Sequence, residues 1–222
     1  KTYVERVVLK AIQNQIAIYA VHTALDNHPM GVNQIICQQL GIKNSEILVP
    51  KENFIRKLVT YTVPNNHEQL RNALFKAGAG NIGNYDHCSF NTLGNGTYRG
   101  IENSNPKIGK QFEFVENEEI KIEVTFEKHL QGKVLKALFA NHLYEEVAYE
   151  IYSLENQHQN IGLGRIGELD KALSETEFLQ MVKDKLQCGG IRHSAFMGKP
   201  IKKVAVLGGS GSFAIQNAKQ LG

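Results

Sequence analysis

The sequence has no tryptophan and only three cysteines and five prolines among its 222 residues. Cys37, Cys88 and Cys188 lie far apart and form no CxxC pair. This spacing argues against a zinc site or a thiol catalyst, and we interpret the three as reduced structural thiols. Reduced thiols are typical of cytoplasmic proteins, and we therefore expect a cytoplasmic location.

The sequence also lacks a long apolar run and a large excess of charge of either sign. No apolar run approaches the roughly 18 residues that a membrane span requires. Residues 1–15 have the pattern of an amphipathic helix and not of a signal peptide. The net charge is +3, and the basic residues are scattered instead of forming a stripe. We therefore expect neither a membrane nor a nucleic acid as partner.

Apolar periodicity in residues 1–55 predicts part of an α/β domain. Residues 16–21 form a continuous apolar run, which is typical of a strand buried on both faces of a parallel sheet. A polar loop with a histidine and an aspartate follows. A helix is then expected from about residue 31 to residue 40, with Gly41 in the position of a left-handed C-cap. Residues 43–57 have weak periodicity and are expected to lead out of this domain.

Residues 56–154 have a different pattern and predict a second, inserted domain. Strands are expected at residues 58–63, 120–126 and 147–154, and the strict alternation in residues 120–126 indicates one wet face. Two helical stripes lie between these strands, formed by Leu70, Ala73, Leu74 and Ala77 and by Leu130, Val134, Leu135, Leu138 and Phe139. Two βαβ-like units of this kind predict a ferredoxin-like α+β sandwich.

Residues 155–222 return to the α/β pattern. We interpret residues 162–169 as a glycine-punctuated turn, and Ser174 with Glu177 as the capping box of a helix. Residues 201–207 predict a buried strand that leads through a glycine-rich loop into a helix from Phe213. The fold class is therefore α/β, with a discontinuous mixed-sheet domain interrupted by the α+β insert. We also expect the chain to be truncated at both ends.

His22 and Asp26 form the first candidate site, because they follow the apolar run at residues 16–21. The Asp26 carboxylate suits a hard or borderline divalent cation. His22 could supply a nitrogen ligand, orient Asp26 or act as an acid–base group. The alternative is that Asp26 caps a turn or helix and that His22 ends a strand.

The second candidate is the loop that contains Gly209, Ser210, Gly211 and Ser212. With Ala214, the two glycines match the GxGxxA fingerprint of a turn that leads from a strand into a helix, where an anion is favoured. No ribose-binding acid can follow some 20 residues later, which argues against a dinucleotide. Close packing of strand on helix is the alternative. Arg165 could pair with a phosphate or carboxylate, or form an ion pair with Glu168.

Several motifs together resemble a known family, the dinuclear-metal-centre proteins of the YbgI/YqfO type, commonly labelled GTP cyclohydrolase 1 type 2 homologs. The motifs are IAIYAVHTALDNHPMGVN, GTYRG, YEEVAYEIYSLEN, GLGRIGEL and KKVAVLGGSGSF, in this order. The insert resembles the CutA/PII-like domain of the longer members. The resemblance implies a hexameric ring, a trimer of dimers, in which each α/β domain holds two divalent metal ions of the zinc, iron or manganese type.

The resemblance also implies roles for individual residues. Asp26 matches a metal-ligating aspartate, and His22 matches a histidine at the lip of the site with a catalytic role. The other ligands of the family, a His-His pair and a His-x-x-x-Glu pair, have no counterpart in this sequence, so the site is incomplete here. We expect a metal-dependent, hydrolase-like enzyme that acts on a nucleotide or another anionic small molecule.

The competing prediction is a regulatory or scaffold ring without enzymatic activity, in which the metals are structural and the insert senses a small ligand. A dinucleotide-dependent oxidoreductase is a distant third possibility.

Overall fold

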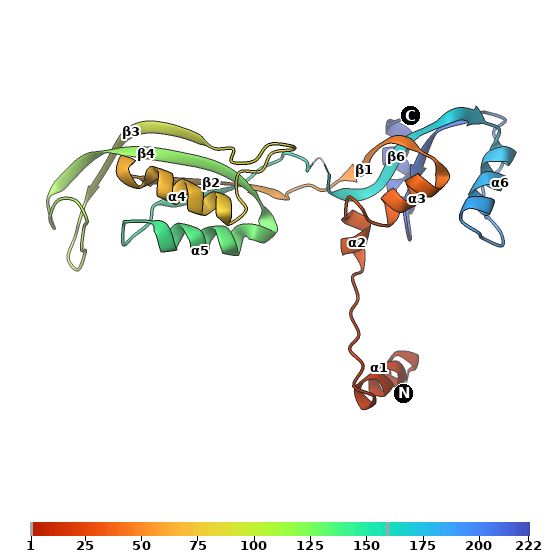
Figure 1. Cartoon of the computed structure of the whole chain (residues 1–222), viewed down its shortest axis with the longest axis horizontal. Helices are drawn as coiled ribbons and strands as arrows, with labels where there is room; N and C mark the ends of the chain where they lie inside the picture. Colours follow the sequence, from red (N-terminus) through yellow and green to blue (C-terminus); the bar gives the residue numbers. More distant parts are fainter. Residues whose placement is uncertain (1, 159) are drawn as a thin grey trace. The chain divides into compact units, whose positions relative to one another are not determined.

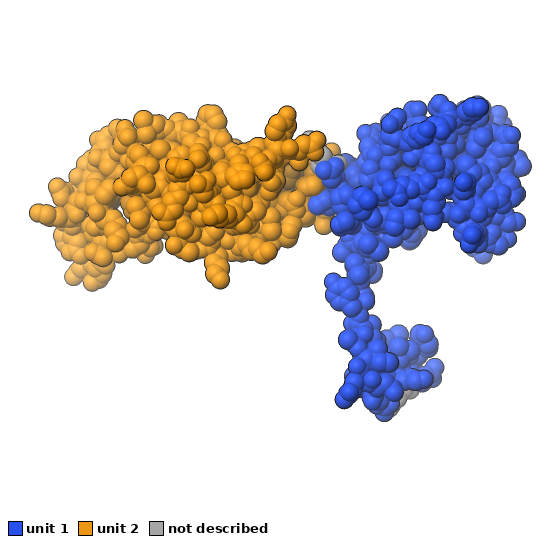
Figure 2. Space-filling view, viewed as in Figure 1, with its two compact units in different colours: residues 1–50, 160–222 blue, residues 51–159 orange. Residues whose placement is uncertain are grey.

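The computed structural model describes residues 2–158 and 160–222, which form two compact units. Unit 1 comprises residues 1–50 and 160–222, and unit 2 comprises residues 51–159 (Figure 2). The sequence analysis placed the two boundaries after residues 55 and 154. The predicted fold class, an α/β domain interrupted by an α+β insert, is confirmed.

Unit 1 contains five α-helices among its described residues: α1 (Tyr3–Gln13), α2 (Thr23–Asn27), α3 (Val32–Leu40), α6 (Glu175–Lys185) and α7 (Ile215–Gln220). The 3-10 turn η2 (Ser212–Ala214) leads into α7. Two predicted helix ends are confirmed. Gly41 ends α3 with a left-handed φ of 73°, and the predicted capping box of Ser174 and Glu177 begins α6.

The sheet of unit 1 is formed by β1 (Lys43–Pro50), β6 (Gly162–Leu173) and β7 (Ile201–Val206), in the order β1-β6-β7. Both pairings are antiparallel, so these strands do not form the mixed sheet that was expected. Val204 and Val206 of β7 are buried whereas Lys203 and Ala205 are exposed, so this strand buries one face. The sequence analysis also missed β1.

The segment at residues 162–169 lies in β6 and is not the predicted turn. Its glycines allow β1 to approach closely. A side chain on Gly162 would lie 2.9 Å from the Pro50 backbone, and one on Gly167 would lie 3.0 Å from the Ser45 backbone. Gly164 has a φ of 68°, which L side chains rarely adopt. The glycines of this segment therefore permit a tight strand pair, although a segment so rich in glycine is more typical of a turn.

The apolar run at residues 16–21 is not a strand. No strand in residues 2–158 or 160–222 pairs with it, and Ile16, Ile18 and Tyr19 are 61%, 64% and 88% exposed. A strand is stable only beside a partner. Apart from Ala11, the apolar stripe of α1 is likewise exposed, although α1 itself forms as predicted.

Unit 2 consists of β2 (Ile55–Thr62), α4 (Pro64–Lys76), β3 (Phe90–Arg99), β4 (Phe114–Glu127), η1 (Lys128–Leu130), α5 (Gln131–Asn141) and β5 (Tyr149–Ser153). Apart from the short 3-10 turn, the order is β-α-β-β-α-β. The four strands form an antiparallel sheet in the order β3-β4-β2-β5, which is the ferredoxin-like arrangement (Figure 1). None of the helices in the described ranges has the length and apolar character needed to cross a bilayer.

The sheet of unit 2 has one face covered by helices and one open face. Helices α4 and α5 cover the first face, where the core contains Leu58, Leu70, Leu74, Ile122, Val124, Phe126, Val134 and Leu138. The predicted alternation in β4 is thus confirmed. The burial predicted for Phe139 was wrong, because this side chain is 51% exposed.

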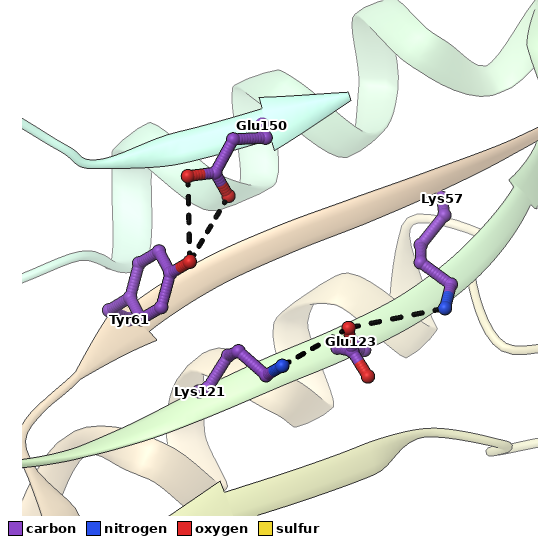
Figure 3. Close-up of polar contacts among 5 residues, drawn as sticks. All are labelled: Lys57, Tyr61, Lys121, Glu123 and Glu150. Atoms are coloured by element: carbon purple, nitrogen blue, oxygen red, sulfur yellow. Dashed lines mark hydrogen bonds and ion pairs between the residues drawn. The ribbon is translucent and has the colours of Figure 1, made fainter. Parts of the chain in front are cut away.

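Polar side chains gather on the open face (Figure 3). The Glu123 carboxylate lies 3.4 Å from Nζ of Lys121 and 4.0 Å from Nζ of Lys57. The Tyr61 hydroxyl lies 3.4–3.5 Å from the two carboxylate oxygens of Glu150. We call this surface the open face of unit 2.

The core of unit 2 leads to a first prediction. Leu70 is fully buried, and its replacement by alanine leaves a cavity, so L70A should lower the free energy of unfolding by about 2–5 kcal/mol. Leu93 is 61% exposed, and L93A is the matched control. L93A should change the free energy of unfolding by no more than about 0.5 kcal/mol. Urea denaturation followed by circular dichroism measures both. Equal effects would contradict the assigned core.

Candidate functional site

Asp26 and His22 lie on the short helix α2 and at its start. His22 occupies the N-cap position with a φ of 46°, a left-handed conformation that is uncommon for a residue with a side chain. Its side chain is exposed, whereas Asp26 is half-buried. The sequence analysis placed Asp26 in a loop, but the structure places it in the short helix α2, which precedes α3. The two residues are four positions apart on one helical turn.

A tight turn at residues 28–31 fixes α2 against α3. The backbone N–H of Gly31 donates to the His28 carbonyl at 2.8 Å, and the N–H of Met30 donates to Nδ1 of His28 at 3.1 Å. A side chain on Gly31 would collide with the Leu25 carbonyl. Glycine is therefore required here because the two helices approach too closely for a Cβ atom.

Asn33 joins α2 to the glycine loop at residues 208–212. Its amide nitrogen donates to the backbone carbonyl of Asp26 at 3.0 Å, and its amide oxygen accepts the N–H of Gly208 at 2.7 Å. Asn33 is only 3% exposed. Both ends of a buried amide are thus satisfied, and such a bridge fixes the distance between the two segments it joins. The structure therefore brings the Asp26 turn and the glycine loop to the same part of unit 1.

The glycine loop forms a strand-to-helix turn, as predicted. Gly209 has a φ of 86°, and a side chain on Gly211 would press on Leu207 at 2.9 Å. The N–H of Gly208 already bonds to Asn33. The loop leads through η2 into α7. Close packing thus accounts for Gly211, while Ser210 and Ser212 belong to the same turn.

Among the described residues, Arg165 does not form the ion pair with Glu168 that was considered for it. Its guanidinium donates to the Ser45 side-chain oxygen at 2.9 Å and to the Ser45 carbonyl at 2.6 Å, across the β1–β6 pair. Arg165 therefore braces the sheet. Cys37 lies nearby and is fully buried, and this burial raises the pKa of its thiol, in agreement with a structural role.

The residues near Asp26 do not by themselves fit a metal centre. Across residues 2–158 and 160–222, no group of three or more histidine, cysteine, aspartate or glutamate side chains is placed to hold a metal ion. Asp26 has the chemistry of a ligand, and its backbone is anchored. One carboxylate, however, is far from the four to six ligands that bound divalent metals take in proteins.

Sequence reasoning missed two polar features. Asn33 shares the buried side of α3 with Cys37 and Leu40, at positions i, i+4 and i+7, and this spacing is the signal that could have found it. In unit 2, Glu127 lies 3.3 Å from Nδ1 of His129 and 3.2 Å from Nε2 of His158. No sequence spacing reveals this pair of histidines, because it depends on the fold.

The Asn33 bridge yields a second prediction. N33A leaves the Gly208 N–H and the Asp26 carbonyl without their partner, so unit 1 should lose about 1–3 kcal/mol of stability. Hydrogen exchange at the Gly208 amide should accelerate. Asn66, in unit 2, is equally buried and bonds to Thr62 and Asn141, so N66A is the matched control. An unchanged Gly208 exchange rate in N33A would contradict the bridge.

Comparisons with known proteins assign the chain to a family. The model of the family Duf34/NIF3 (NGG1p interacting factor 3) matches residues 1–222. A "GTP cyclohydrolase 1 type 2 homolog" of Halalkalibacterium halodurans is 42% identical over 221 residues, which cover 98% of this chain and 59% of the relative. Its counterpart in Bacillus subtilis is 39% identical over 218 residues, with coverage of 98% and 58%.

A solved structure agrees with this assignment. The crystal structure of a Bacillus cereus protein related to NIF3 superposes with a TM-score of 0.82 at 39% identity, covering 98% of this chain and 58% of that one. The chain thus spans slightly less than three fifths of the relatives it matches. By its sequence and by its fold, the chain belongs to the Duf34/NIF3 family.

Proposed function

We propose that this protein binds divalent metal ions and that Asp26 supplies one of the ligands. The observation that carries the proposal is the anchoring of the Asp26 turn: its backbone is tied to the buried Asn33, and its side chain stays half-buried. A carboxylate carried on an anchored backbone loses less conformational entropy when it binds a cation than one on a mobile segment. The proposed pair of metals is of the zinc, iron or manganese type.

The proposed chemistry is a hydrolase-like reaction on a nucleotide or another anionic small molecule. The names of the relatives, which contain "GTP cyclohydrolase 1 type 2", support this class. His22 is exposed at the start of α2, where its ring is accessible to a substrate, and we assign it a proton-transfer role. The loop from Gly209 to Ser212 would line the site on the side that Asn33 connects to Asp26.

The remaining ligands come, in this proposal, from outside the residues that the structure describes. A hexameric ring in the cytoplasm is the proposed assembly. Because the relatives are longer than this chain, the activity belongs to the protein at the relatives' full length.

A regulatory ring without enzymatic activity is the second candidate. It is favoured by unit 2, which has a hydrophobic core of its own and forms a compact unit separate from the residues around Asp26. In this case the metals stabilise the ring, and unit 2 senses a ligand. Metal binding without metal-dependent turnover of any nucleotide or phosphoester would favour this candidate.

The test of metal binding compares two aspartates in the protein at its relatives' full length. D26N removes the ligand charge with almost no change in shape, and should lower zinc affinity at least tenfold in isothermal titration calorimetry. Asp170 pairs with Lys43 on the surface of the same unit, and D170N should leave the affinity unchanged. If D26N binds as much zinc as the unmodified protein does, Asp26 is not a ligand.

A further inference from the structure

The two helices of unit 2 enclose a surface groove of about 670 Å³. Its lining comes from α4, from the C-cap Ala77 of that helix and from α5, and consists of alanines, lysines and side-chain amides. We call it the α4–α5 groove. All of its lining residues belong to unit 2, so the inference drawn from it does not depend on the metal function proposed for Asp26.

The two helices run antiparallel along the groove (Figure 1). Near the start of α4, the amide nitrogen of Asn66 donates to the carbonyl of Asn141, the last residue of α5, at 3.2 Å. Just past the end of α4, a side chain on Gly78 would lie 2.9 Å from the side chain of Leu130, which precedes α5. The last turn of α4 therefore lies beside the first turn of α5.

Three lysines gather at this end of the groove. Lys76 is the last residue of α4, and Lys133 and Lys136 lie in the first two turns of α5. The lining contains no aspartate or glutamate. The ion pairs found in residues 2–158 and 160–222 all involve other side chains. The three ammonium groups therefore share one end of the groove without a carboxylate to offset their charge.

The fold concentrates here a basic charge that looks scattered in the sequence. Helices α4 and α5 carry four basic residues, Arg71 and the three lysines, and a single acidic residue, Glu68. This excess of three positive charges equals the net charge of the whole chain, +3. The rest of the chain is therefore balanced, and three of the four basic residues face one groove.

The two lysines of α5 are placed against the interest of their own helix. Lys133 lies in the first turn, where the helix dipole disfavours a cation, and no acidic residue lies in that turn. Lys136 follows three positions later, so the two like charges are neighbours on the helix surface and repel each other. Carboxylates supplied by a partner would relieve this repulsion.

The groove is uncharged away from the lysines. Ala73, Ala137 and Ala140 line it there, and their small side chains let another chain approach closely. The side-chain amides of Gln69 and Asn72 also border it and form no hydrogen bond within the described ranges. A side-chain amide offers both a donor and an acceptor, which is the combination that a peptide backbone requires.

We propose that the α4–α5 groove binds an acidic segment of a partner protein, whose carboxylates contact Lys76, Lys133 and Lys136 and whose backbone hydrogen-bonds to Gln69 and Asn72. The unpaired lysines also attract such a segment before contact, which speeds the encounter. A phosphate group alone would contact the lysine end only, whereas a peptide also uses the alanines and amides. The open groove is thus an interaction surface, separate from the proposed metal centre.

The test measures fluorescence polarisation of a fluorescein-labelled decapeptide, five glutamates followed by five alanines, with the protein at its relatives' full length. The peptide should bind saturably, and its counterpart with glutamine in place of glutamate should not. K133Q/K136Q preserves helix propensity and should weaken binding about fivefold or more. K183Q/K185Q, the matched control, removes two lysines from α6 in unit 1 and should leave binding unchanged.

Lys76 gives an independent variant, because it belongs to the other helix. K76Q should weaken binding of the glutamate peptide about twofold or more. Binding that both K76Q and K133Q/K136Q leave unchanged would overturn the proposal. An equal loss of binding in K183Q/K185Q would also overturn it, because it would show a general effect of charge.

Two further measurements separate the peptide from other occupants. Inorganic tripolyphosphate, added at the molar concentration of the peptide, should leave the peptide bound, and full displacement would assign the groove to phosphate ligands instead. Analytical ultracentrifugation should give the same oligomeric state for K133Q/K136Q and the unmodified protein. If the variant dissociates and its peptide affinity is unchanged, the groove is an interface between copies of the chain and the proposal is wrong.

Discussion

Unit 1 depends on the antiparallel pairing of β1 with β6, because these strands precede and follow the whole of unit 2 in the sequence. Their register runs from Lys43 opposite Glu168 to Pro50 opposite Gly162. The glycines of β6 let the two backbones approach closely, and Arg165 ties the pair together through Ser45. Without this pairing, the Asp26 turn and the glycine loop would belong to two unconnected pieces of chain.

The candidate site uses this scaffold through one buried amide. Asn33 bonds to the backbone on both sides, at Asp26 and at Gly208, and holds together segments far apart in the sequence. An amide suits this position because it carries a donor and an acceptor on one rigid group. The anchored part is the backbone of α2, which leaves the Asp26 carboxylate free to bind a cation.

The sequence predicted those elements whose stabilising contacts are local or follow from alternation. The capping box at Ser174, the C-cap at Gly41 and the buried face of β4 were all correct, because each depends on residues a few positions apart. The pairing partners could not be predicted. Residues 16–21 have the composition of a strand but no partner strand in the described chain. Strand β1 pairs with β6, but it was missed because its apolar periodicity is weak.

The site shows the same division. Asp26 could be selected because its residue type and motif carry chemistry in themselves. The role of Asn33 depends on a contact with Gly208 that only the folded sheet creates. Long-range pairing therefore determines which polar groups meet.

Unit 1 thus offers one candidate ligand, the Asp26 carboxylate, on a backbone that Asn33 anchors. The central claim is that the Asp26 carboxylate binds metal. It is tested most directly by a crystal structure of the protein at its relatives' full length, grown with zinc and measured at the zinc absorption edge. The account predicts an anomalous peak about 2.0–2.2 Å from an Asp26 carboxylate oxygen. A zinc peak elsewhere, with the Asp26 carboxylate unbound, would contradict it.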